Sequence, residues 1–207
     1  MSTSRSSDTE PVGFLQGVKS DFNTRAWVII PVGVGINVAL GAVVQALHLP
    51  IFLDVVGTIL VAIMCGPWVA AVTGITTNVV MTAVNPIWIC YAPLQAIIGI
   101  VAGILAVKGL MRTNIGRLVV GLILTVTAAV IAAPIIVATT GGAGGTGESA
   151  ITAFFLATGD QIWSSVVKSK FIVEPIDKIL SVFIAVLIIK VLPARYRTTR
   201  ATRALTR

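Results

Sequence analysis

Hydrophobic residues run almost without interruption from Trp27 to Leu192. Between Val28 and Val107 the sequence holds one charged residue, Asp54. A water-soluble domain of this size would lack the polar side chains needed to cover such a surface. The pattern therefore predicts a protein that folds in a lipid bilayer, where the few polar residues of the apolar segments are the main candidates for function.

The apolar segments have the pattern of helices. Residues 59–64 are hydrophobic without alternation, whereas strands of a membrane β-barrel alternate between apolar and polar residues. We therefore predict an all-α, polytopic membrane bundle with six transmembrane helices. The expected spans are residues 26–47, 51–66, 68–84, 90–107, 118–139 and 174–192. The expected divisions are a cytoplasmic tail (1–25), a membrane domain (26–193) and a basic cytoplasmic tail (194–207).

Charge places both chain ends on one side of the membrane. The net charge is +7, and the basic residues gather before residue 26, in the loop at 108–117 and after residue 189. The positive-inside rule assigns these places to the cytoplasm, so the number of crossings must be even. Residues 151–167 are amphipathic, and we expect them to lie at the outer surface or to re-enter without crossing. Contact of the C-terminal tail with anionic lipid is favoured over nucleic acid.

Charged residues also precede the last predicted span. Lys168 and Lys170 fall outside the cell in this topology, which is a mild exception to the rule. Glu174 stands just before Pro175, and we predict a solvated residue at the start of a helix.

Three further ionisable residues are candidates to contact a solute. Asp54 is predicted at the outer start of the second span, where it either contacts a ligand or caps the helix. Asp177 and Lys178 are predicted at the outer start of the last span. Since adjacent residues point about 100° apart on a helix, we expect them to have separate partners. Lys178 would hold an anionic group of a ligand or pair with Asp54 or Asp160.

Amide and aromatic residues gather at the predicted outer halves of the third and fourth spans. They are Asn78, Asn85, Trp88, Tyr91 and Gln95. Such side chains together suit a flat heterocycle, which they can stack against and hydrogen-bond at its edge. Single aromatics, including Trp163, also fit the interfacial aromatic belt. Asp160 and Trp163 complete the set of candidate substrate-binding residues.

Two small residues of the first span, Gly35 and Ala39, stand four positions apart. Small residues at this spacing let another helix approach closely. The pair would serve either the docking of a second membrane protein or packing among this chain's own helices.

Motifs of enzymes are missing from the sequence. It has no G-x-x-x-x-G-K-[ST] phosphate-binding loop, and His48 is the only histidine. No Ser-His-Asp set and no metal-ligand cluster is apparent, and Cys65 and Cys90 form no redox or metal motif. We therefore expect neither catalysis, nor a cofactor, nor a metal.

A pattern spread over residues 26–194 resembles a known family. It consists of Leu49-Pro50-Ile51-Phe52-Leu53-Asp54, Gly57-Thr58, Gly66-Pro67-Trp68, Gly74, Asn78, Gly145-Thr146-Gly147, Asp177-Lys178 and Leu192-Pro193. The length, six predicted spans and basic ends agree with it. In these respects the chain resembles the substrate-binding (S) components of energy-coupling factor (ECF) transporters.

The resemblance implies a substrate-binding subunit of an ATP-driven importer in a bacterial or archaeal plasma membrane. Such a subunit binds a vitamin or vitamin precursor from outside and docks on a membrane coupling subunit with two ATPase subunits. The resemblance gives Gly35 and Ala39 the docking role, although the family usually carries alanine where Gly35 stands. It also implies loops that cover the ligand and toppling of the whole subunit to release it.

Two hypotheses from other classes stay open. One is an ion-coupled secondary transporter that acts as a homodimer, which requires an acidic residue near the middle of the membrane, whereas Asp54 and Asp177 are expected near the outer edge. The other is a structural or assembly subunit that binds no ligand.

Overall fold

The hydrophobic segments form helices of very unequal length. In the computed structural model, the described residues are 21–142, 145–193 and Thr202. The α-helices are α2 (Thr24–Ala46), α3 (Val56–Cys65), α4 (Pro67–Met81), α5 (Ala92–Val107), α6 (Asn114–Thr140), α7 (Gly147–Ala157) and α8 (Ile162–Val191). Short 3-10 helices η1 (Pro86–Tyr91) and η2 (Leu110–Arg112) flank α5, and these described parts contain no strand. The all-helical prediction is therefore confirmed for them.

The predicted tails fall mostly outside the described residues. The tail at 1–25 is described only from Asp21, where burial raises the pKa of the side chain and the backbone N–H of Trp68 opposes the rise. Of the basic tail at 194–207, only Thr202 is described.

Helix α3 occupies the centre of the bundle. Every residue from Val56 to Met64 is buried, and α2, α4, α5 and α8 all pack against the helix. A ten-residue helix is about 15 Å long, which is half of the ~30 Å apolar core of a bilayer. The prediction of a span over residues 51–66 is therefore wrong in length, because residues 51–53 are not helical and the helix begins only at Val56.

Glycines let α3 approach its neighbours closely. A Cβ atom on Gly57 would lie 2.0 Å from the carbonyl oxygen of Gly33 in α2. Gly66 ends α3 and precedes α4 with a φ of 98°, in the region of backbone conformation that favours glycine. The two helices are thereby joined by one residue.

Asn37 of α2 links three helices from a fully buried position. Its side-chain oxygen accepts a hydrogen bond from the backbone N–H of Gly57 at 2.6 Å. Its amide nitrogen donates to the hydroxyls of Thr58 in α3 and Thr77 in α4, at 2.9 and 3.0 Å. A free N–H at the first turn of α3 is thus satisfied by another helix.

The last helix differs from its prediction. Residues 162–191 form one helix that continues through Pro175, so the predicted segment 151–167 is divided between α7 and α8. Pro175 is tolerated inside a helix that neighbours surround, and Thr125 of α6 donates a hydrogen bond to the Glu174 carbonyl at 3.2 Å.

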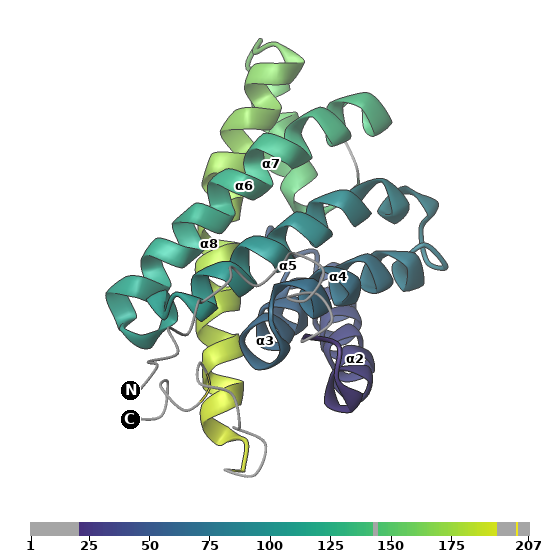
Figure 1. Ribbon diagram of the computed structural model, residues 1–207. Helices are drawn as coiled ribbons and strands as arrows, with labels where there is room; N and C mark the ends of the chain where they lie inside the picture. The colour runs from purple at the N-terminus through teal and green to yellow at the C-terminus, as the bar shows by residue number, and fades with distance from the viewer. Residues whose placement is uncertain (1–20, 143–144, 194–201, 203–207) are drawn as a thin grey trace, which may run out of the picture.

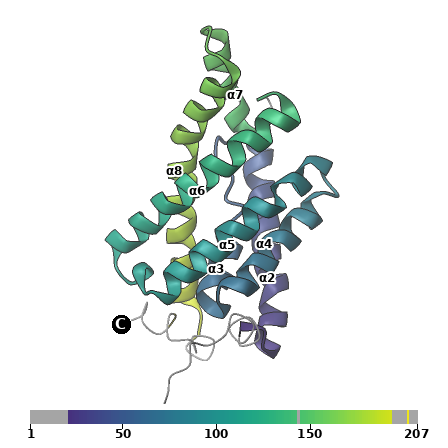
Figure 2. The same cartoon turned by 45° about the horizontal axis from the view of Figure 1, so that its top comes forward.

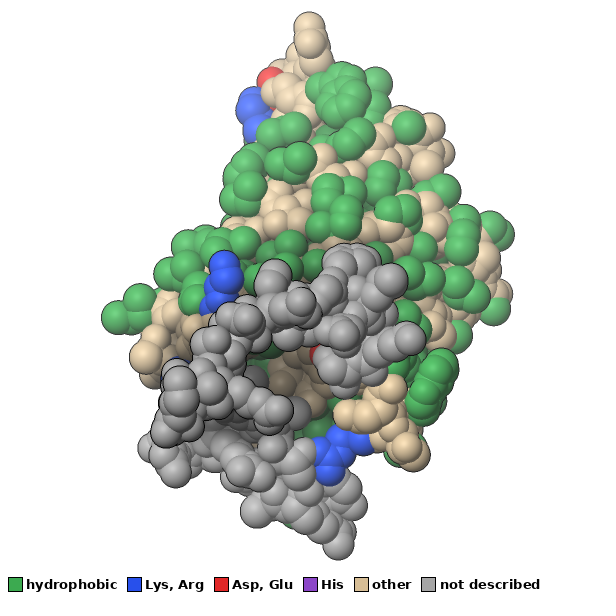
Figure 3. Space-filling model, viewed as in Figure 1, with side chains coloured by type: hydrophobic (Ala, Val, Ile, Leu, Met, Phe, Trp, Pro, Cys, Tyr) green, Lys and Arg blue, Asp and Glu red, His purple; other side chains and the backbone are tan. Residues whose placement is uncertain are grey.

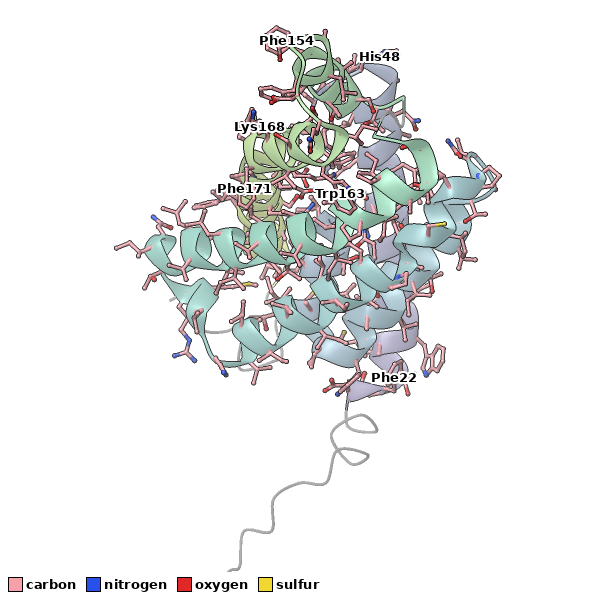
Figure 4. All side chains as sticks on the ribbon, turned by 90° about the horizontal axis from the view of Figure 1, so that it is seen from above. Phe22, His48, Phe154, Trp163, Lys168 and Phe171 are labelled. Atoms are coloured by element: carbon pink, nitrogen blue, oxygen red, sulfur yellow. The ribbon has the colours of Figure 1, made fainter. Side chains whose placement is uncertain are left out.

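The long helices define the direction of the bundle (Figures 1 and 2). Helix α8 runs along one side, with α7 beside its first half and α6 across it. The start of α2 and the end of α8 lie towards the same end of the molecule in both views. Figure 4 marks the two ends of α2 by Phe22 and His48, and His48 lies at the end where Phe154 of α7 is found.

Three helical stretches among the described residues are long and apolar enough to cross a bilayer. They are Thr24–Ala46, Pro86–Val107 and Asn114–Thr140. Large hydrophobic side chains are also exposed on the helices, and green side chains cover much of the face in Figure 3. Among them are Val32, Val43, Val79, Leu122, Val126, Val130 and Leu187. Because soluble monomers rarely expose so much apolar surface, these features indicate a membrane protein. Six crossings and cytoplasmic chain ends stay predictions.

Candidate functional site

A cavity lies where the connection between α2 and α3 meets η1, α5, α6 and α8. Its volume is about 70 Å³, and a second cavity of about 120 Å³ adjoins it and shares five lining residues, among them Asp54 and Trp88. One water needs about 10–15 Å³ of such a volume, so the first cavity has room for a small organic molecule. Predicted site residues that line it are Asp54, Asn85, Trp88, Tyr91, Gln95 and Lys178.

The connection at residues 47–55 forms one wall of both cavities without being helical. It turns back along the last turns of α2, since a Cβ on Gly41 would lie 3.7 Å from that of Asp54. Near its start, the carbonyl oxygen of Leu49 closely approaches Gly147 of α7, where a Cβ would lie 2.3 Å from that oxygen. Irregular backbone inside a membrane protein is stable where it is buried or lines a cavity, as here.

Asp177 of α8 holds this connection in place. Its Oδ1 atom accepts hydrogen bonds from the backbone N–H groups of Phe52 at 3.0 Å and Leu53 at 2.7 Å. The carboxylate therefore faces the protein backbone and does not line either cavity. Asp177 lies midway along α8 and not at the start of the helix, and its position at the outer start of a span stays a prediction.

Buried ion pairs connect α7 to α8 beside the cavity. Lys170 Nζ lies 2.7 Å from Glu148 Oε2 and 3.3 Å from Glu174 Oε1. Lys178 Nζ lies 3.0 Å from Glu174 Oε2 and is also paired with Asp177. All five residues are at most 3% exposed. Burial raises the pKa of Glu148, and the Lys170 ammonium opposes that rise.

One prediction about these residues is wrong, and another is confirmed only in part. Glu174 is buried and 2% exposed, where a solvated residue was expected, because α8 continues through Pro175 and places it inside the bundle. Asp177 and Lys178 each have the separate partners that were expected, the backbone of Phe52 and Leu53 and the Glu174 carboxylate, but they also pair with each other. The 100° between adjacent Cβ directions does not prevent this pairing, because the long lysine side chain bends back to the carboxylate.

Asp54 also lines the cavity, but it does not take part in the ion pairs that join Glu148, Lys170, Glu174, Asp177 and Lys178. No ammonium or guanidinium nitrogen of the described residues lies within 4.0 Å of its carboxylate. Its Oδ2 atom accepts a hydrogen bond of 3.1 Å from the side-chain amide of Gln95. The capping alternative is wrong, because the residue before the helix is Val55 and no side chain caps α3 there.

Aromatic side chains form another part of the wall. The rings of Trp88 and Tyr91 lie 5.9 Å apart between centroids, at an angle of 52°. Lys170 Nζ lies 5.1 Å from the centroid of Phe52, a cation–π contact that sequence reasoning did not predict. Asn85 caps η1, and its side-chain oxygen accepts a hydrogen bond from the backbone N–H of Ile87.

Several polar atoms of the lining lack a partner. The indole N–H of Trp88, the Oε1 atom of Gln95 and the Oε1 atom of Glu148 are buried and make no hydrogen bond to any described residue. Buried polar groups are nearly always hydrogen-bonded, so unpaired ones around a cavity indicate a place for a polar ligand or water.

The remaining predicted substrate-binding residues lie elsewhere. Asn78 is fully buried in α4, and its amide atoms have no partner among the described residues. Asp160 forms an exposed ion pair with Lys168 at 2.7 Å, and Trp163 is 54% exposed. None of the three lines either cavity.

The two predicted docking residues lie on the outside of α2. Gly35 and Ala39 are both exposed, and a Cβ on Gly35 would have no atom within 4 Å. The alternative of packing among this chain's own helices is therefore wrong for Gly35. The glycine that packs internally is Gly33, two positions away.

Comparison with known proteins does not assign the chain to a family. No protein-family model, no curated protein and no solved structure matches the chain. The resemblance to ECF substrate-binding components therefore stays a prediction, and the geometry of the site carries the functional argument.

Sequence reasoning missed the part of the site that α7 and α8 supply. Glu148 and Lys170 line the cavity, although neither was a candidate. The sequence did contain one signal for this contact. Lys170 was an exception to the positive-inside rule, and a charged residue in a membrane protein with few charges is expected to have a partner of opposite charge. The partner, Glu148, is 22 positions away and on a different helix, so spacing gave no indication of it.

Proposed function

We propose that this chain is the substrate-binding membrane subunit of an ATP-driven importer of the ECF type, which takes up a vitamin or vitamin precursor. The observation that carries the proposal is the cavity, in which the indole N–H of Trp88 and the Oε1 atoms of Gln95 and Glu148 have no hydrogen-bond partner among the described residues. Small-molecule sites combine an enclosed, largely apolar wall with a few such polar atoms.

Energy for import would come from partner proteins. The sequence has no phosphate-binding loop, so an ATPase module must be separate. The exposed face of α2 at Gly35 and Ala39 supports docking of a membrane coupling subunit, because small residues allow close helix approach. In this proposal the protein is a multi-pass protein of a bacterial or archaeal plasma membrane, with both chain ends in the cytoplasm and the cavity towards the outside.

The test is retention of a ligand by the full-length chain. The protein is purified in lipid nanodiscs, and the small molecules that it retains are identified by mass spectrometry against empty nanodiscs. We expect one retained compound, lost in a Trp88→Ala variant and kept in a Trp163→Ala variant, since only the first residue lines the cavity. Absence of any retained compound and of ATP-dependent uptake in cells would disprove the proposal.

One observation favours a second function, a secondary transporter driven by an ion gradient. Asp177 and Glu174 lie in the middle of α8, whereas the sequence placed acidic residues near the outer edge. Buried acidic residues in membrane helices often carry protons during transport. Uptake that persists without ATP and stops when a protonophore is added would favour this function over the first.

A further inference from the structure

We propose that the cavity binds an organic cation with a flat ring, which rests on the function proposed above and narrows its substrate class. The first observation is the balance of charge. Asp54, Glu148 and Glu174 line the cavity, and Lys170 and Lys178 are the lysines that line it. Three carboxylates against two ammonium groups leave one negative charge in excess when all are ionised, and Asp177 behind Lys178 adds another.

The second observation is that the lysines are already engaged. Each ammonium group contacts two carboxylates, Lys170 those of Glu148 and Glu174, and Lys178 those of Glu174 and Asp177. An anionic ligand would have to displace one of these buried carboxylates, which would leave it unpaired at high cost. The sequence-based expectation that Lys178 holds an anionic group therefore loses its support.

The third observation is which atoms remain for a ligand. No ammonium or guanidinium nitrogen of the described residues lies within 4.0 Å of the Asp54 carboxylate, although the Lys178 charge acts on it from farther away, and Asp54 lines both cavities. The unpaired Oε1 atoms of Gln95 and Glu148, both nine-tenths buried, are acceptors. A positively charged donor complements the Asp54 carboxylate and such acceptors, and it removes the excess negative charge from the interior.

The cation is organic and carries a ring. No group of three or more His, Cys, Asp or Glu side chains among the described residues is arranged to hold a metal ion. Trp88 and Tyr91 offer ring surfaces, and the rest of the wall is apolar at Leu94 and Ile98. Aromatic faces attract cations and stack with flat rings, so a protonated or quaternary heterocycle fits the wall.

The first arm of the test uses the charge of what the protein binds. Full-length protein in nanodiscs is offered three probes of similar shape at neutral pH: benzylammonium, benzyl alcohol and benzoate. We expect benzylammonium to bind at least tenfold more tightly than benzyl alcohol, and benzoate more weakly than either. Equal binding of the three, absence of binding, or preference for benzoate would overturn the inference, as would a retained natural compound that is an anion.

The second arm uses matched variants. Asp54→Asn should lower the affinity for benzylammonium and remove its tenfold preference over benzyl alcohol. Asp160→Asn removes an exposed carboxylate outside both cavities, and it should change neither. Comparable helix content of both variants by circular dichroism guards against misfolding. If Asp54→Asn retains the full preference, the inference is wrong.

The test of the ligand class and the test of the importer function can fail independently of each other. A cation that binds but is taken up without ATP would disprove the ECF-type function and leave the cation inference standing. An anion that binds and is taken up only with ATP would do the reverse.

Discussion

Two regions of this molecule are held together by different means. Around α3 the helices meet through glycines and one amide, with Gly33 against Gly57 and Asn37 bridging α2, α3 and α4. Between α7 and α8 the contact depends on buried ions, with Lys170 between Glu148 and Glu174. We call these the small-residue region and the ionic region.

The difference shows which region is suited to change with a ligand. Close backbone contact permits one arrangement, since any displacement loses van der Waals contacts at once. Ions with several partners can exchange them, and a charged ligand would enter that exchange. The cavity lies against the ionic region, since Glu148, Lys170 and Glu174 line it, whereas Gly33, Asn37 and Gly57 of the small-residue region do not.

The largest expected effect tests the ionic region. Lys170→Met leaves two buried carboxylates without their shared partner, and we expect a loss of about 3–5 kcal/mol in the free energy of unfolding. Unfolding in mixed detergent micelles with increasing sodium dodecyl sulfate would measure it. The double variant Lys170→Met/Glu148→Gln should recover part of the loss, and no recovery would show that charge is not the cause.

A somewhat smaller effect is expected in the small-residue region. In a Gly57→Ala variant the added methyl group would lie 2.0 Å from the Gly33 oxygen, so α2 and α3 must separate. Overpacking of this kind costs about 1–3 kcal/mol. The matched control is Gly35→Ala, which meets no atom within 4 Å and should be neutral in the same unfolding assay. Equal loss in both variants would contradict the assignment of Gly33 and Gly57 as the contact.

The amide that links the small-residue region should matter less. Asn37→Leu removes three hydrogen bonds and leaves the buried N–H of Gly57 without its partner. An unsatisfied buried donor costs about 1–3 kcal/mol, and part of that is offset by the apolar replacement. We expect a loss of about 1–2 kcal/mol, together with faster hydrogen exchange at the first turn of α3. Unchanged exchange there would argue against the bridging role.

The smallest expected effect tests whether an exposed ion pair contributes less to stability than a buried one. Lys168→Met removes the partner of Asp160 in an ion pair that is 49% and 29% exposed at its two side chains. Exposed pairs contribute about 0–1 kcal/mol, so this variant should unfold almost as the natural protein does. A loss as large as that of Lys170→Met would remove the distinction between the two kinds of pair.

The sequence predicted helices well where hydrophobic runs were long. The expected spans at 26–47 and 118–139 correspond to α2 and α6 within a few residues. It failed around α3, because the apolar run 51–66 cannot show that its first residues are non-helical. That conformation depends on Asp177, more than 120 positions away, which accepts hydrogen bonds from the backbone at Phe52 and Leu53.

The part of the site that is formed by residues close together in the sequence was also predictable. Asn85, Trp88, Tyr91 and Gln95 lie within 11 positions on η1 and α5, so local spacing brought them together. Pro175 misled the reading of Glu174, since a proline usually marks a helix start and here stands inside α8. The pairing of Glu148 with Lys170 depends on how α7 folds against α8, which no local pattern records.

The one-residue junction at Gly66 has a consequence for biosynthesis. In a bilayer, α3 is too short to be recognised by the insertion machinery as an independent stop-transfer segment. We therefore expect it to enter the lipid together with α4, whose 15 residues follow directly after Gly66. A substitution that stiffens position 66 would then act first on insertion, before any solute meets the finished protein.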